Sequence, residues 1–354
     1  MALLYSQLVV ASMVVAGALL AILSGVMNGF FTLPMRFLGR WQWENVWSLF
    51  IIVACLLLPA LLISLTAPDS WPVLASSPSH AVWVAILTGF AWGFGSIMFG
   101  QSVSAIGISL ANTFVLAISS ILGSLLPLLI PSAARLFEPT GRRIAAGVLI
   151  EIVGIVLCGR AGSLREKAVG IGASAGRGDL VGKARPLGVA LLLVMGSGVL
   201  SAVFNVGFTL AQPIADHGRS AGLSQFASTN LIWLIILAAG SIANLGFCIY
   251  LLARNGSVLK FRQSGSGRLY SLTLVMGLLW GGSIFVYGAA APRLGRLGTS
   301  IGWPLSLAMG LLTANAIGLA LGEWKTAPRP ARSWMFSGIA VLLVAIVVLS
   351  FASS

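Results

Sequence analysis

The chain is divided into long apolar runs, and this feature limits its fold more than any other. The runs are roughly 18 to 25 residues long, the length that a helix needs to cross about 30 Å of hydrocarbon. Only 8% of the 354 residues are charged, against about a quarter in an ordinary soluble domain. With 58% hydrophobic residues and a mean hydropathy of +1.00, the chain cannot cover a water-facing surface. The sequence therefore predicts an all-α polytopic membrane protein.

Ten apolar runs are present, and each predicts one transmembrane helix. They cover residues 8–33, 46–66, 81–103, 106–131, 142–160, 187–212, 228–251, 268–291, 297–321 and 333–350. Pro59, Pro127 and Pro304 lie within or near span ends, where a membrane helix tolerates a local break. The longest polar stretch, residues 161–186, is rich in Gly, Arg and Lys and separates five spans from five.

Several short motifs occur in the same order in both halves of the chain. The matching pairs are Ser24-Gly25-Val26 with Ser197-Gly198-Val199, Gly89-Phe90-Ala91-Trp92-Gly93 with Gly277-Leu278-Leu279-Trp280-Gly281, and Ile106-Gly107-Ile108-Ser109 with Leu297-Gly298-Thr299-Ser300. Because each half has an odd number of spans, the second half must enter the bilayer from the opposite side. The motifs therefore predict an inverted repeat, which is typical of secondary transporters. Its parts are a first five-helix repeat in 1–160, a cytoplasmic linker in 161–186 and a second five-helix repeat in 187–354.

The distribution of Lys and Arg predicts the orientation of the chain. Fifteen of these 21 residues fall in the connectors and adjoining span ends on one side, including 161–186, and six fall on the other. Positive connectors stay in the cytoplasm, so we expect a bacterial inner (cytoplasmic) membrane protein with both termini in the periplasm. The formal charge of +13 is spread over short connectors and does not predict nucleic-acid binding. The three cysteines lie far apart in predicted spans and the two histidines in connectors, so we expect no metal and no cofactor.

Spans three and eight each carry aromatic and hydroxyl side chains on one helical stripe. The stripes consist of Trp92, Ser96 and Phe99 in span three and of Trp280, Ser283 and Tyr287 in span eight. If the two halves form an inverted repeat, Trp92 and Trp280 face a shared central cavity. The same spans contain glycines four residues apart, which let a neighbouring backbone approach closely. These pairs are Gly89 with Gly93 and Gly277 with Gly281.

Aromatic rings beside hydroxyls and amides suit a sugar. The C–H faces of a pyranose pack on a flat ring, while its hydroxyls need donors and acceptors at the edge. Amides that lie within or near the predicted spans and can supply these groups are Asn28, Gln101, Asn112, Asn205 and Gln212. The alternative is that the aromatic residues belong to the interfacial belts or to helix packing, and the sequence leaves it open.

Carboxylates are scarce, and two of them are candidates for carrying a proton. Glu151 is the one that lies at the centre of a predicted span, where an ionisable residue is a functional candidate by default. Glu44 lies at the start of the second span, close to the predicted cytoplasmic boundary. The structural alternatives are an interfacial ion pair for Glu44 and a neutral acid at a helix contact for Glu151.

Further motifs occur over nearly the whole chain, in the order and at the intervals of one transporter family. They are Trp41-Gln42-Trp43-Glu44-Asn45-Val46-Trp47, Trp92-Gly93 with Phe99-Gly100, Arg160-Ala161-Gly162-Ser163-Leu164-Arg165-Glu166, Asn244-Leu245-Gly246-Phe247-Cys248, Trp280, Tyr287, Trp303 and Glu323-Trp324. In these the chain resembles the L-rhamnose–proton symporter family, within the drug/metabolite transporter superfamily. The resemblance implies ten helices, an inverted five-plus-five repeat and proton-driven uptake of a 6-deoxyhexose. It also implies that helices five and ten are peripheral, which favours Glu44 over Glu151 for proton coupling.

Three functions from different classes are consistent with these observations. The first is a proton-coupled symporter that imports a monosaccharide, with L-rhamnose preferred, by alternating access. Its partners are the sugar, the proton and the lipid bilayer, and its cavity walls are Trp92, Trp280, Tyr287 and Trp303. The second is a drug or metabolite exporter on the same scaffold. The third is an intramembrane enzyme, which we do not expect because no catalytic histidine chemistry is visible.

Overall fold

The computed structural model of the protein describes residues 2–39, 41–168 and 186–352. Ten of its helical segments are long and apolar enough to cross a membrane. They are α1 (Ala2–Phe30), the continuous α2 (Trp43–Ile51), η2 (Ile52–Leu57) and α3 (Leu58–Thr66), α5 (Ser79–Ile106), α6 (Ile108–Leu129), α7 (Pro139–Ala168), α8 (Leu187–Leu210), α10 (Gln225–Arg254), α11 (Ser266–Arg293), α12 (Gly298–Ala320) and α13 (Arg329–Ser350). Short helices lie between them: η1 (Leu33–Phe37), α4 (Trp71–Ala75), η3 (Ala133–Phe137), α9 (Gln212–Ser220) and η4 (Ser257–Arg262). The ten predicted spans are confirmed, and the chain is a multi-pass membrane protein.

The predicted end of the fifth span lies too early in the chain. The helix α7 continues through residues 161–168, which we expected to belong to the connector. Its last turn carries Arg165 and Lys167, and cations are favourable at the negative end of a helix. Of the predicted linker, residues 169–185 lie outside the described part of the chain.

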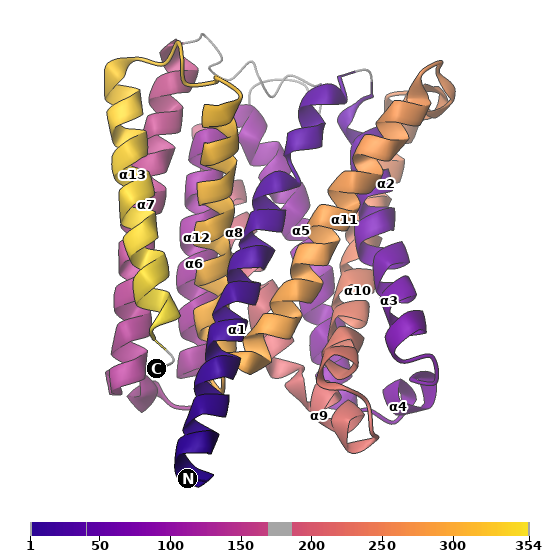
Figure 1. Cartoon of the computed structure of the whole chain (residues 1–354). Helices are drawn as coiled ribbons and strands as arrows, with labels where there is room; N and C mark the ends of the chain where they lie inside the picture. Colours follow the sequence, from indigo (N-terminus) through magenta and orange to yellow (C-terminus); the bar gives the residue numbers. More distant parts are fainter. Residues whose placement is uncertain (1, 40, 169–185, 353–354) are drawn as a thin grey trace.

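The two ends of the bundle differ in what they carry (Figure 1). Both chain termini lie at one end, which we call the terminal end. The opposite end, where α7 finishes and α8 starts, we call the basic end. Arg165 and Lys167 lie there, as do Lys260 in η4 and Lys325 between α12 and α13. Which end faces the cytoplasm stays a prediction.

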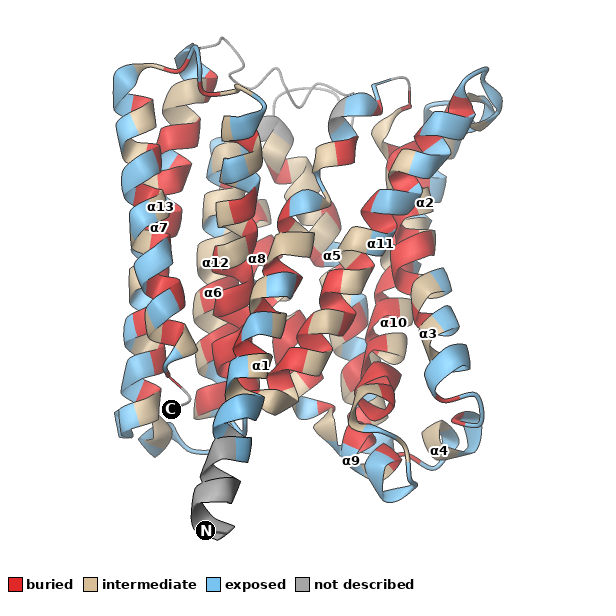
Figure 2. Ribbon diagram, viewed as in Figure 1, coloured by how far each residue is buried: buried red, intermediate tan, exposed pale blue. Residues whose placement is uncertain are grey.

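The helices pack in pairs that recur across the two halves of the chain. α5 packs on α8 as α11 packs on α1, and α6 packs on α8 as α12 packs on α1. α7 and α13 pack against each other at one edge of the bundle (Figure 1). Buried residues face the inside of the bundle, and exposed residues lie on its outer faces (Figure 2). These outer faces carry large apolar side chains such as Leu19, Leu149 and Leu192, as contact with lipid requires.

Glycines set the closest helix contacts, as their spacing predicts. A Cβ atom at Gly89 would lie 2.2 Å from the carbonyl oxygen of Ile236 on α10, and one at Gly93 would lie 2.5 Å from the carbonyl oxygen of Gly240. In the other half, a Cβ atom at Gly277 would lie 2.5 Å from a methyl carbon of Val53. Two backbones therefore meet where α5 crosses α10, whereas Gly277 makes room for the side chain of Val53.

The second span contains a wide turn. η2 is a π-helix, and it comes two residues before Pro59. Proline lacks an N–H and its ring clashes with the carbonyl group four residues earlier, so the regular hydrogen-bond pattern cannot pass through it. The predicted local break is confirmed here, whereas Pro127 and Pro304 lie inside helices that continue past them.

Candidate functional site

A cavity of about 220 Å³ lies at the centre of the bundle. Six helices contribute to its wall: α1, α5, α6, α8, α11 and α12. Its lining consists of Ser24, Asn28, Phe31, Trp92, Phe99, Asn112, Val115, Leu116, Ser201, Phe204, Trp280, Ser283, Ile284, Tyr287, Trp303, Ser306 and Leu307. Of the residues predicted to bind substrate, it therefore brings together Asn28, Trp92, Asn112, Trp280, Ser283, Tyr287 and Trp303.

The two tryptophans that the repeat predicts to face a shared cavity both line it, and they stack on each other. The ring centroids of Trp92 and Trp280 are 5.3 Å apart, with planes 12° from parallel. Phe204 also packs against Trp92, with ring centroids 4.8 Å apart and planes tilted by 39°. The cavity therefore has a wall of aromatic planes, which offers apolar surface to a flat ligand.

Polar groups occupy the same cavity. The hydroxyls of Ser24 and Ser306 lie 2.9 Å apart, and Ser283 donates to the carbonyl oxygen of Trp280 at 2.6 Å. The amides of Asn28 and Asn112 line the cavity and form no hydrogen bond within the described chain. Their donors and acceptors are therefore free for a ligand.

A smaller cavity of about 140 Å³ adjoins the first and shares Trp92, Phe99 and Trp280 with it. Ser96, another predicted site residue, lines this second space. Its hydroxyl donates to Oδ1 of Asn244 at 2.6 Å. Trp47 Nε1 donates to the same oxygen at 3.0 Å. Asn244 thus holds α2, α5 and α10 together. Sequence reasoning did not select Asn244 as a site residue, although it lies in one of the family-like motifs.

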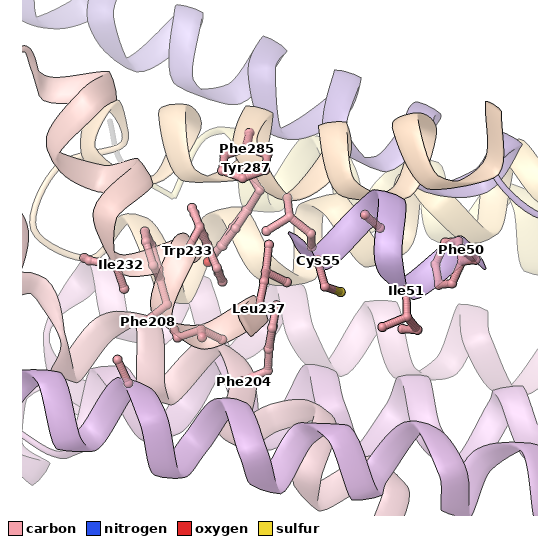
Figure 3. Close-up of a cluster of buried hydrophobic side chains, with 14 of the residues drawn as sticks. Phe50, Ile51, Cys55, Phe204, Phe208, Ile232, Trp233, Leu237, Phe285 and Tyr287 are labelled. Atoms are coloured by element: carbon pink, nitrogen blue, oxygen red, sulfur yellow. The ribbon is translucent and has the colours of Figure 1, made fainter. Parts of the chain in front are cut away.

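An aromatic plug closes the central cavity toward the terminal end. It consists of Phe204, Phe208, Trp233, Tyr287 and Trp303, four of which are drawn in Figure 3 as part of a buried cluster. Phe208 and Trp233 stack at 4.3 Å, and Tyr287 meets Trp303 edge-on at 5.5 Å. Toward the basic end, the lining instead reaches Asn28, near the last turn of α1, and Asn112, near the first turn of α6.

Asn205, predicted as a hydroxyl partner for the sugar, lies behind the plug. Its Oδ1 accepts a hydrogen bond from the hydroxyl of Tyr287, and its Nδ2 donates to the carbonyl oxygens of Gly123 at 2.8 Å and Thr299 at 3.2 Å. The amide is fully buried and fastens α8 to α6, α11 and α12. Gln101, near the end of α5, lies outside the lining of either cavity.

The two candidate carboxylates lie in different environments. Glu44 accepts hydrogen bonds from Nδ2 of Asn255 at 3.0 Å and from Oγ of Ser257 at 2.6 Å. It therefore fastens the turn between α10 and η4 onto the start of α2, at the basic end and away from the central cavity. Glu151 is 0% exposed on α7, and its Oε2 accepts a hydrogen bond from Ser120 on α6 at 2.5 Å.

Three charged residues that sequence reasoning did not select lie at the basic end. Glu166 accepts hydrogen bonds from the backbone N–H of Ser109 at 3.1 Å and from its hydroxyl at 2.6 Å, which caps the start of α6. Arg165 and Glu323 form an ion pair at 2.5 Å, and the Arg165 guanidinium lies 4.9 Å from the ring centre of Trp324. The only sequence signal for them was their place in family-like motifs.

Comparison with known proteins places the chain in a family. The family model of the L-rhamnose-proton symport protein (RhaT) matches residues 10–353. The L-rhamnose-proton symporter of Cronobacter sakazakii is 29% identical over 322 residues, which cover 89% of this chain and 91% of that protein. The L-rhamnose-proton symporters of Citrobacter koseri and Escherichia coli are 27% and 28% identical over the same shares. Because the match extends over almost the entire chain, the protein belongs to the L-rhamnose-proton symport protein family.

Proposed function

We propose that the protein is a symporter that imports L-rhamnose together with protons across a bacterial inner membrane. The observation that carries the proposal is the central cavity, in which stacked indoles lie beside two free amides. Relatives that share about 90% of their length with this chain are named L-rhamnose-proton symporters. The family and the chemistry of the cavity therefore support the same class of substrate.

The cavity suits a 6-deoxyhexose in both size and polarity. Its volume of about 220 Å³ is below the roughly 300 to 1,000 Å³ of sites that hold drug-sized ligands. One side of such a sugar carries C–H groups and a methyl group, which pack on Trp92 and Trp280. Its hydroxyls pair with the amides of Asn28 and Asn112, and with Ser283 where the ring approaches α11.

The lining also bears on the exporter alternative. A pocket for lipophilic cations needs an acidic group to balance the ligand charge. No Asp or Glu lines the central cavity within the described chain. The cavity therefore favours a neutral polar ligand.

We further propose that the two halves form an inverted five-plus-five repeat that works by alternating access. The recurring contacts of α5 with α8 and of α11 with α1 support this relation. With the basic end in the cytoplasm and both termini in the periplasm, the plug closes the periplasmic side. The structure then corresponds to an inward-facing state, and import requires a second state in which the plug opens.

The experiment that tests this function uses purified protein in proteoliposomes. We expect saturable uptake of labelled L-rhamnose that rises when the interior is made alkaline. Addition of L-rhamnose to de-energised vesicles should make the external medium alkaline as protons enter with the sugar. Uptake that ignores the pH gradient would contradict coupling. Stabilisation by lipophilic cations with no rhamnose uptake would favour an exporter.

A further inference from the structure

Glu151 is an isolated acid in the interior of the protein. α6, α12, α13 and η3 pack against α7, and within the described chain α6 and α12 contain no charged residue. The charged residue of η3, Arg135, lies beside the start of α7 and is 16 residues before Glu151 in the sequence. The charged residues of α13 are at its start, at the basic end. On α7 itself the nearest cations in sequence, Arg143 and Arg160, are at least eight residues away, or about 12 Å along a helix. Glu151 therefore has no cation beside it, and a salt bridge does not explain its presence.

One oxygen of this carboxyl group has no partner. Ser120 donates to Oε2, whereas Oε1 forms no hydrogen bond within the described chain. The hydroxyl of Ser124, one turn from Ser120 on α6, is also buried and without a partner there. Natural proteins pair nearly all buried polar atoms, and unpaired ones require an explanation. A group that binds and releases a proton provides one.

A side cavity of about 200 Å³ leads from the basic end toward Glu151. We use this name for the space between α6, α7 and α12, which the Arg165–Glu323 pair lines at the basic end. Its lining includes Leu116, four residues before Ser120 on α6, and Ile155, four residues after Glu151 on α7. Four residues are about one turn of helix, or 6 Å. The side cavity thus extends from the basic end to within about one helical turn of the carboxyl group, which gives a proton a route between Glu151 and that end.

The same turn of α6 connects Glu151 to the central cavity. Ser120 binds Glu151, and its neighbour Ser119 lies 3.0 Å from the hydroxyl of Ser201. Trp303 Nε1 donates to the carbonyl oxygen of Ser119 at 3.2 Å. Ser201 and Trp303 both line the central cavity. A shift or rotation of α6 would therefore alter both sites together.

We propose that Glu151 is the proton-binding residue of the transporter, that it releases its proton to the basic end through the side cavity, and that it is coupled to the sugar site through Ser119 and Ser120. The proposal rests on the proposed function, because it assigns the proton site of that symporter. A proton adds to the carboxylate from water on one side and returns to water on the other side after the sites have reoriented. The sugar and the proton each favour the same position of α6, which makes their coupling reciprocal. Glu44, whose acceptors hold a turn in place, has a structural role.

The experiment compares wild type, Glu151→Gln and Glu44→Gln in proteoliposomes. Two rates are measured for each: exchange of labelled for unlabelled L-rhamnose without a gradient, and accumulation driven by an alkaline interior. We expect Glu151→Gln to keep exchange and to lose accumulation above the external concentration. Glu44→Gln should keep both, with a lower melting temperature. Accumulation by Glu151→Gln, or loss of coupling in Glu44→Gln alone, would overturn the proposal.

A second variant covers the case in which Glu151→Gln does not insert or exchange. Glu151→Asp keeps a carboxyl group but moves it away from Ser120, so the pH dependence of uptake should shift. An unchanged pH profile would then count against Glu151. If wild type exchanges no rhamnose, the proposed substrate is wrong. The role of Glu151 is then tested with any other sugar whose addition to wild-type vesicles changes the external pH, by asking whether Glu151→Gln abolishes that change.

Discussion

At the scale of single residues, the stacked pair of Trp92 and Trp280 is the feature from which most of the sugar chemistry follows. The two indoles stack on each other, and the parts of their surface that neighbouring rings do not cover line the cavity. A pyranose held against these rings removes apolar surface from water while its hydroxyls reach Asn28 and Asn112. The first prediction concerns this wall.

Replacement of Trp280 by alanine should weaken the binding of L-rhamnose. Loss of one aromatic wall should weaken binding about tenfold or more, since 1.4 kcal/mol corresponds to one factor of ten. The measurement is the shift in melting temperature with added L-rhamnose. Trp83→Ala is the matched control, because Trp83 lies on α5 with 61% of its surface exposed. An equal rhamnose-dependent shift in wild type and Trp280→Ala would refute the site.

Asn205 shows the limit of what the sequence reveals at this scale. The sequence predicts amides within spans, but it does not state which side of a helix faces the cavity and which faces a neighbouring carbonyl group. Asn28 and Asn112 keep free amides, whereas that of Asn205 binds three groups on other helices. The difference arises from how α8 packs against α6 and α12, and the periodicity of a single segment does not predict that packing.

Asn205→Ala should therefore destabilise the protein. The change removes the acceptor of the buried Tyr287 hydroxyl and one hydrogen bond to each of two carbonyl oxygens, at a cost of about 2 kcal/mol or more. We expect a lower melting temperature in detergent. Asn315→Ala is the control, since Asn315 bonds only the carbonyl oxygen of Leu311 one turn away on its own helix. Equal stability of the two variants would contradict the fastening role of Asn205.

At the scale of elements, hydropathy predicted all ten spans because each helix must supply its own run of apolar residues. It missed the last turns of α7, because Arg165, Glu166 and Lys167 have the composition of a connector. Those turns are helical in the structure, where Glu166 holds the start of α6. The cavities are formed by helices that are distant in sequence. Their lining could therefore be predicted only for residues of spans that the repeat motifs matched with each other, such as Trp92 and Trp280.

The turn between α5 and α6 yields a prediction of its own. Gly107 has a φ of 83°, and a Cβ atom there would lie 2.9 Å from Oε2 of Glu166. Gly107→Ala should therefore cost about 1 to 3 kcal/mol through backbone strain and displace the cap of α6. Gly267→Ala, where a Cβ atom meets nothing within 4 Å and φ is ordinary, is the control and should not destabilise. The measurement is the melting temperature of each variant. Equal melting temperatures for Gly107→Ala and Gly267→Ala would contradict the strain at Gly107.

At the scale of the whole molecule, the orientation of the chain in the membrane decides which compartment the end of the cavity opposite the plug faces. Alkaline phosphatase needs disulfides and is active only in the periplasm. We expect an active fusion after Ser354 and an inactive one after Lys260, which lies at the basic end. The opposite pattern would place the basic end outside the cell and reverse the assignment of the inward-facing state.

The aromatic plug has a consequence for how transport responds to temperature. When the plugged side opens, rings that now touch one another become hydrated, and hydration of apolar surface raises heat capacity. The barrier to reorientation should therefore change with temperature rather than stay constant. Plots of the logarithm of the exchange rate against reciprocal temperature should curve, and substitution of Phe208 by alanine should straighten them. The plug that closes one side of the sugar cavity thus also sets the thermal range over which the carrier turns over.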